Sequence, residues 1–174
     1  MQLEEAIRLI NHKEVMRSHP QRWADLGCGS GLFTAALASL LQKSSAIYAV
    51  DKSAHALQQV LASESVLIEK IEADFIQDDL RFRDLDGILM ANSLHFVKDK
   101  TAFIHKAESY FKAKEYFLIV EYDMDVSNPW VPFPLSYYSL QSLFKKLGYN
   151  FIDKISETPS RYNRSNIYSV AVRK

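Results

Sequence analysis

Short runs of hydrophobic residues alternate with longer amphipathic segments along most of the chain. The short runs predict strands at 22–26, 46–50, 66–73, 88–91 and 116–120. Between them, hydrophobic residues recur three or four positions apart, as they do on one face of a helix. This spacing is found at Leu32, Phe33, Ala36, Leu37, Leu40 and Leu41, at Leu57, Val60 and Leu61, and at Phe103, Ile104, Ala107, Tyr110 and Phe111. The order predicts an α/β fold with helices on both faces of a mostly parallel sheet.

The two ends of the chain add elements outside this alternation. Helical spacing predicts one amphipathic helix over Leu3 to Val15 and another over Tyr137 to Leu147. The hydrophobic runs at 149–155 and 166–172 leave no room between them for a crossover helix. Parallel strands need such a crossover, so these two runs predict an antiparallel hairpin.

Composition narrows the class of protein. A chain of 174 residues has the usual length of one domain, so we expect a single domain over residues 1–174. Twenty-one basic and twenty-one acidic side chains leave no net charge, which argues against nucleic acid or an anionic membrane as a partner. Cys28 is the only cysteine, and no hydrophobic stretch reaches the roughly 20 residues of a membrane span. We expect a cytoplasmic protein without disulfides.

A glycine-rich loop directly follows the first predicted strand. Gly27, Gly29 and Gly31 expose backbone N–H groups that a ligand can approach closely, at the start of a helix whose dipole favours a negative group. A tight strand-to-helix turn needs glycines for steric reasons as well, so the loop alone is a weak signal. It gains weight from Asp51 at the end of the second predicted strand, where a carboxylate can bind ribose hydroxyls. The alternative for Asp51 is an ordinary helix-capping role.

Two features of this loop separate the candidate cofactors. Dinucleotide enzymes typically carry Gly-x-Gly-x-x-Gly, whereas Gly31 arrives one residue sooner. Asp25 stands two residues before the first glycine, where its carboxylate would repel a pyrophosphate but attract the ammonium of an amino acid. The sequence therefore favours S-adenosylmethionine (SAM), which carries an amino-acid group on a nucleoside.

Four segments resemble motifs of one enzyme family. Residues 23–31, Trp-Ala-Asp-Leu-Gly-Cys-Gly-Ser-Gly, are similar to motif I of the class I SAM-dependent methyltransferases of the small-molecule type. Residues 48–53 resemble the next motif, and residues 73–75 resemble the segment beside the adenine. Residues 86–96 resemble the fourth-strand motif that borders the methyl-donor pocket. The resemblance spans nearly the whole chain after Arg22.

The resemblance implies a fold, a reaction and a set of cofactor residues. The fold is a Rossmann-like, mostly parallel seven-stranded sheet with helices on both faces, and its antiparallel seventh strand is inserted beside the fifth. The reaction moves the methyl group of SAM to a small acceptor by in-line displacement and leaves S-adenosylhomocysteine (SAH). The implied cofactor-binding residues are Asp25, Gly27, Cys28, Gly29, Gly31, Asp51, Lys52, Asp74, Phe75 and Asn92.

Candidate acceptor residues follow the fourth and fifth predicted strands. His95 is the best-placed base for a hydroxyl or protonated amine, with a structural histidine as the alternative. Trp130, Phe133 and Tyr137 would line an apolar pocket together with His95, although they could equally be packed under a long loop. Asn92 begins Asn-Ser-Leu-His rather than the Asn/Asp-Pro-Pro-Tyr/Phe signature of DNA and protein-amide methylation, which argues against those acceptors.

Rival interpretations remain at this stage. The same cradle could serve a nicotinamide-dependent oxidoreductase, or the chain could be a non-catalytic methyltransferase-like binding subunit. The helix within residues 1–19 is a candidate lid over the cofactor, or it only packs on the sheet. No metal site is expected, because the remaining histidines, His12, His19, His55 and His105, lack ligand spacing.

Overall fold

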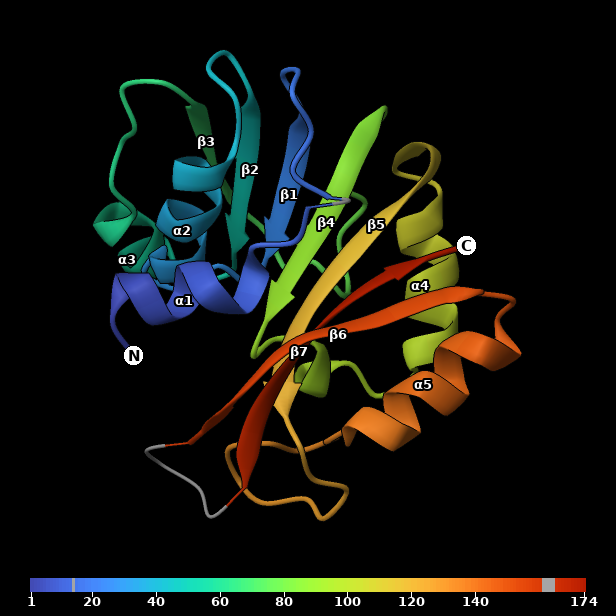
Figure 1. Cartoon of the computed structure of the whole chain (residues 1–174). Coiled ribbons are helices and arrows are strands. Elements are labelled where there is room, and N and C mark those ends of the chain that lie inside the picture. Colours follow the sequence, from blue (N-terminus) through green and yellow to red (C-terminus); the bar gives the residue numbers. More distant parts are fainter. Residues whose placement is uncertain (14, 161–164) are drawn as a thin grey trace.

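Seven strands form one sheet in the order β3-β2-β1-β4-β5-β7-β6. The computed structural model describes residues 1–13, 15–160 and 165–174. Strands β1 to β5 run parallel to one another, and β7 lies antiparallel between β5 and β6 (Figure 1). The predicted fold class, including the terminal hairpin and the insertion of the last strand beside the fifth, is confirmed. The strands are β1 (Arg22–Leu26), β2 (Ala46–Asp51), β3 (Leu67–Glu72), β4 (Leu85–Ala91), β5 (Phe111–Tyr122), β6 (Phe151–Pro159) and β7 (Asn166–Arg173).

Helices cover both faces of the sheet. Helices α1 and α2 pack with Trp23 and Leu89 on one face, and α4 and α5 pack with Ile88 and Phe117 on the other. The central strands are therefore buried on both faces, which explains their unbroken hydrophobic runs. Within the described ranges, no helix is long and hydrophobic enough to cross a membrane. The helices are α1 (Leu3–Ile10), α2 (Leu32–Leu40), α3 (Ala54–Gln59), α4 (Lys100–Glu108), α5 (Tyr137–Lys146) and the short 3-10 helix η1 (Leu94–Phe96).

Three helix ends differ from the sequence prediction. The first helix stops at Ile10 rather than Val15, because the backbone turns to an extended conformation at the next residue. Val15 is nevertheless buried, so it continued the hydrophobic pattern without being helical. Phe111 begins β5 instead of continuing α4, since its backbone pairs with Leu85. Leu61 lies beyond α3 and is 75% exposed, so it belongs to no core face.

Gly87 of β4 lies against the fully buried ring of Trp23 in β1, and a Cβ at position 87 would lie 2.2 Å from Cη2 of that ring. We predict that Gly87→Ala lowers the free energy of unfolding by about 1 to 3 kcal/mol, as overpacked cores do. Urea titration followed by circular dichroism measures the loss. In a Trp23→Leu background the same substitution should cost less, and an equal cost in both backgrounds would contradict the steric explanation.

Candidate functional site

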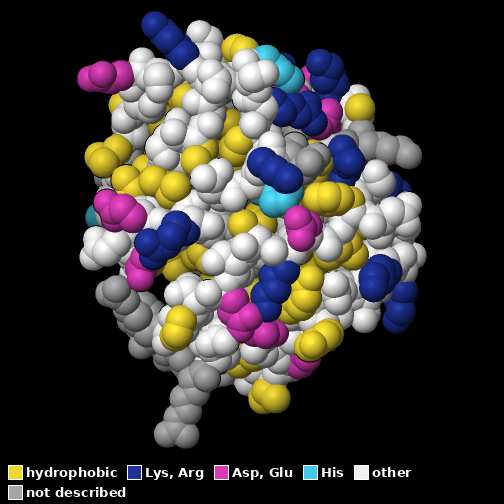
Figure 2. Space-filling view, in the orientation of Figure 1, with side chains coloured by type: hydrophobic (Ala, Val, Ile, Leu, Met, Phe, Trp, Pro, Cys, Tyr) yellow, Lys and Arg dark blue, Asp and Glu magenta, His cyan; other side chains and the backbone are white. Residues whose placement is uncertain are grey.

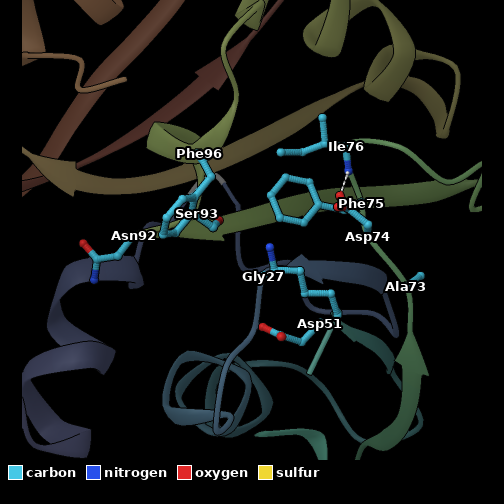
Figure 3. Close-up of a pocket in the computed structure, with 10 residues that line it drawn as sticks. Gly27, Asp51, Ala73, Asp74, Phe75, Ile76, Asn92, Ser93 and Phe96 are labelled. Atoms are coloured by element: carbon cyan, nitrogen blue, oxygen red, sulfur yellow. Dashed lines mark hydrogen bonds between the residues drawn. The ribbon is translucent and has the colours of Figure 1, made fainter. Parts of the chain in front are cut away.

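A cleft with about 480 Å³ of empty space opens at the carboxyl ends of β1, β2, β3 and β4 (Figure 3). It lies where the strand order reverses between β1 and β4, the usual ligand position in open parallel sheets. The cleft is thus bounded by loops that follow four different strands. Its lining residues are Gly27, Asp51, Lys52, Ala73, Asp74, Phe75, Ile76, Asn92, Ser93 and Phe96.

The glycine loop forms one wall, and its conformation needs glycine at each of the three positions. Gly27, Gly29 and Gly31 all have positive φ angles, of 78°, 54° and 88°. A Cβ on Gly27 would lie 2.6 Å from Cβ of Ser93, so the first glycine lets the loop after β4 come close. A Cβ on Gly29 would meet no atom within 4 Å, so the second glycine faces open space. The loop is therefore a preformed backbone cradle.

Cys28 lies within this loop, but its side chain packs away from the cleft. It is buried against Ala49, Leu57 and Val60, and burial raises the pKa of its thiol far above the ordinary range. Only its backbone serves the cradle, where its N–H donates to the Val50 carbonyl across 3.0 Å.

Asp51 connects the end of β2 to the cradle. Its Oδ2 accepts a hydrogen bond of 2.9 Å from the Gly29 N–H, and its Oδ1 accepts one of 2.9 Å from the Ser53 N–H. Each carboxylate oxygen has a further lone pair. Asp51 can therefore fix the loop and still accept hydrogen bonds from a ligand hydroxyl in the cleft.

Asp25 is the least satisfied charged side chain near the cradle. It is 1% exposed, and its Oδ2 accepts a hydrogen bond of 2.6 Å from the Thr34 hydroxyl of α2. Its Oδ1 is buried and has no hydrogen-bond partner in the described part of the chain. Burial raises the pKa of Asp25 from 3.8 to about 7, the Thr34 bond opposes that shift, and the charge of Asp51 adds to it. Such a carboxylate is stabilised by a cation brought to its free oxygen.

The turn after β3 forms the opposite wall. Asp74 caps this turn, since its Oδ1 accepts a hydrogen bond of 2.9 Å from the Ile76 N–H. The Phe75 ring lines the cleft and rests edge-on against Phe103 of α4, with 5.7 Å between ring centroids. Lys106 of α4 fixes the turn from outside by donating to the Ile76 carbonyl across 3.1 Å and to two neighbouring carbonyls. These contacts hold the wall in place and leave the second carboxylate oxygen of Asp74 available to a ligand.

The loop after β4 closes the third side. Asn92 has a φ of 54°, a left-handed conformation that asparagine tolerates better than most residues. Its N–H donates to the Val120 carbonyl, while its buried Oδ1 has no partner among the described residues. The Ser93 hydroxyl donates to the Leu26 carbonyl across 2.6 Å, which ties β4 to β1. A second unsatisfied oxygen thus lies beside the cleft.

The structure brings only some of the predicted acceptor residues together. His95 is 3% exposed, and its carbonyl accepts a hydrogen bond of 3.0 Å from the Phe133 N–H, so these two residues are neighbours. Trp130 is 82% exposed and projects from its loop. Tyr137 packs against Tyr168 of β7, with ring centroids 5.6 Å apart. His95 thus lies beside Phe133, whereas Trp130 is exposed and Tyr137 lies against β7.

Several residues that shape the site were not selected from the sequence. Thr34 and Glu121 bond Asp25 and His95, respectively, from distant positions, and no local pattern indicated either of them. Ser93 and Phe96 also line the cleft, and their place within the 86–96 motif was the signal that could have identified them.

Comparisons with known proteins agree with this geometry. A family model described as a methyltransferase domain matches residues 24–113, which include the cradle, Asp51 and the loop after β4. The chain belongs to the methyltransferase domain family. The predicted enzyme class, a class I SAM-dependent methyltransferase, is confirmed at the level of the family. No curated protein matches the sequence of this methyltransferase domain.

Solved structures similar to this methyltransferase domain come from distant organisms. A SAM-dependent methyltransferase from Leishmania major has a TM-score of 0.72 and 18% identity, over 97% of this chain and 70% of that one. The 1,6-didemethyltoxoflavin-N1-methyltransferase of Burkholderia thailandensis, solved with its substrate and SAH, has a TM-score of 0.72 and 17% identity over 99% and 77%. A SAM-dependent methyltransferase from Aquifex aeolicus has a TM-score of 0.64 and 16% identity over 99% and 98%. At these identities the likeness shows the fold alone.

The raised pKa of Asp25 makes the stability of the methyltransferase domain depend on pH. Because the folded state holds this proton more tightly than the unfolded state, the Asp25 contribution to stability is greatest at acidic pH and falls as the pH rises from about 4 to 7. Between about pH 5.5 and pH 8 the Asp25 contribution should fall by roughly 2 kcal/mol, given 1.36 kcal/mol for each pKa unit. We predict that Asp25→Asn removes this part of the pH dependence in urea unfolding at both pH values. Asp79→Asn, which changes an exposed carboxylate, is the control, and equal pH dependence in Asp25→Asn and wild type would contradict the assignment.

Proposed function

We propose that this methyltransferase domain transfers the methyl group of SAM to a small acceptor molecule. The observation that carries the proposal is the buried Oδ1 of Asp25 beside the glycine cradle, an atom with no hydrogen-bond partner among the described residues. An ammonium group would satisfy this oxygen and neutralise the buried charge. SAM and SAH bear an ammonium at the end of their amino-acid group, whereas nicotinamide dinucleotides bear a pyrophosphate that the same carboxylate would repel.

The remaining walls of the cleft offer groups suited to the other parts of SAM. The unsatisfied Oδ1 of Asn92 would accept a second hydrogen bond from the amino-acid group. Asp51 would accept hydrogen bonds from the ribose hydroxyls while it holds the Gly29 N–H. The adenine would lie between the loop and the Phe75 and Ile76 side chains, with the free oxygen of Asp74 toward its exocyclic amine.

SAM supplies an activated methyl group on a sulfonium and a neutral thioether as leaving group. The chain therefore has to hold the acceptor in line with that methyl group, and such positioning is worth several kcal/mol of the barrier. Phe96, which is 49% exposed and lines the cleft, offers an apolar surface for an acceptor at this end. Phe133 is close to the same segment, because its backbone N–H donates a hydrogen bond to the carbonyl of His95.

Two observations support a small acceptor. Basic and acidic side chains are interspersed on the face shown in Figure 2, a distribution that does not suit a long polyanion. The similar Burkholderia enzyme acts on 1,6-didemethyltoxoflavin, a small molecule, and it was solved with this substrate beside SAH.

Isothermal titration calorimetry tests the choice of cofactor directly. We predict that SAH and SAM bind with one site per chain and that NAD gives no binding heat under the same conditions. The reason is the carboxylate of Asp25, which attracts the ammonium and repels the pyrophosphate. Absence of binding by both adenosyl ligands, or preferential binding of NAD, would overturn the proposal.

Asp51→Ala tests the ribose contact. We predict that the substitution weakens SAH binding about tenfold to a hundredfold, because each lost charge-assisted hydrogen bond is worth about 1.5 to 3 kcal/mol. Asp51→Asn keeps an acceptor oxygen for the Gly29 N–H and should bind with intermediate affinity. Circular dichroism checks that both variants fold, and Asp79→Ala serves as the control outside the cleft. Unchanged affinity in Asp51→Ala would show that the residue only supports the loop.

A further inference from the structure

His95 and Glu121 form a buried pair at the carboxyl ends of β4 and β5. The Nδ1 atom of His95 lies 2.7 Å from Oε2 of Glu121, and the backbone N–H of His95 donates to Oε1 across 3.1 Å. The side chains are 4% and 2% exposed, so water competes little for these hydrogen bonds. Both oxygens of Glu121 are thus committed to one residue.

This geometry selects one form of the imidazole. A carboxylate only accepts hydrogen bonds, so the proton of a neutral His95 ring resides on Nδ1. The lone pair is then on Nε2, which makes no hydrogen bond to the described residues. A histidine that served only packing would have both ring nitrogens satisfied when buried. In His95, Nδ1 donates a hydrogen bond to Glu121, and Nε2 remains able to accept a proton.

The pair lies next to the wall of the cleft. Phe96 lines the cleft, and its ring centroid is 4.4 Å from that of His95. Lys100 of α4 holds the neighbouring loop in place, because its Nζ donates to the carbonyls of Val97 and Phe133 across 2.8 and 2.7 Å. The imidazole is therefore placed between the cofactor cleft and the loop after β5.

Among the described residues, Lys100, Tyr168 and Tyr122 are other ionisable groups close to the pair. Burial lowers the pKa of Lys100, and the charge of Glu121 opposes that shift. Burial raises the pKa of Tyr168 in β7, and the charge of Glu121 adds to the shift. Tyr122 of β5 lies beside the imidazole, with 6.1 Å between ring centroids. Glu121 is consequently the acidic group in hydrogen-bond contact with His95.

We infer that Glu121 is a positioning residue that holds His95 ready to take a proton from the methyl acceptor, so the acceptor carries an O–H or N–H group. The inference rests on the proposed function and names its acceptor class. As the lone pair of the acceptor atom forms a bond to the methyl carbon, the acceptor proton passes to Nε2 of His95. The electron pair of the broken carbon–sulfur bond stays on the departing thioether. The imidazolium is stabilised by Glu121 until the proton leaves to water.

Carbethoxylation with diethyl pyrocarbonate tests the inference without a known acceptor. At about pH 8, where imidazoles are mainly neutral, the reagent attacks an accessible ring nitrogen lone pair. We predict that peptide mass spectrometry finds His95 modified in the folded wild-type protein, at a lower rate than the exposed His105. Glu121→Gln should slow His95 modification about threefold to tenfold, since a neutral amide makes Nε2 less basic than a carboxylate does.

Two variants make the test specific. Glu121→Asp keeps the charge and should restore most of the His95 reactivity. Glu108→Gln changes the same kind of contact at His105, where Nδ1 lies 3.3 Å from Oε2, and should leave His95 unaffected. An unmodified His95 in the wild-type protein, or an equal rate in Glu121→Gln, would overturn the inference.

Calorimetry with SAH on the same preparations separates this inference from the proposed function. Binding of SAH together with an inert His95 would remove only the role of the His95–Glu121 pair. Failure to bind SAH would remove the proposed cofactor, whatever the reactivity of His95.

Discussion

A carboxylate buried away from water is stable only if hydrogen bonds or a cation compensate its charge, and in the described part of the chain only one of the two oxygens of Asp25 accepts a hydrogen bond. The Thr34 hydroxyl donates to one oxygen, while the other accepts no hydrogen bond from the described residues at the point where β1 turns into the glycine loop. The surrounding sheet keeps this charge in place, since both faces of β1 are covered by packed helices. In the proposed function, the ammonium of the amino-acid group relieves this cost, so the constraint that destabilises the ligand-free protein would favour cofactor binding.

The fold could be predicted because short segments of the sequence carry the patterns that specify its strands and its glycine loop. Hydrophobic runs of four to eight residues predicted the parallel strands, and the spacing of Gly27, Gly29 and Gly31 predicted the loop. Errors occurred where burial continued beyond an element. Val15 is buried without being helical, and Phe111 is recruited by pairing with Leu85, a contact that no helical pattern contains. Tertiary packing determined these ends.

The cofactor side of the candidate site follows more directly from the sequence than the acceptor side does. Asp51 and Asp74 directly follow two predicted strands, so their positions at the cleft could be derived from the order of the strands. Glu121 contacts His95 across 26 positions of sequence, and only the adjacency of β4 and β5 brings them together. Trp130 and Tyr137 stay predictions for an acceptor pocket, and in the structure Trp130 is largely exposed while Tyr137 packs against Tyr168 of the terminal hairpin.

The central claim, that the ammonium of the cofactor neutralises Asp25, is tested most directly by proton release on SAH binding. Calorimetry at about pH 7 in buffers of different ionisation enthalpy measures this quantity. With a pKa of about 7, Asp25 is half protonated in the empty domain, so binding should release about half a proton per SAH. Asp25→Asn should abolish the release. Binding with no proton release by the wild-type protein, or with the same release by the variant, would contradict the account.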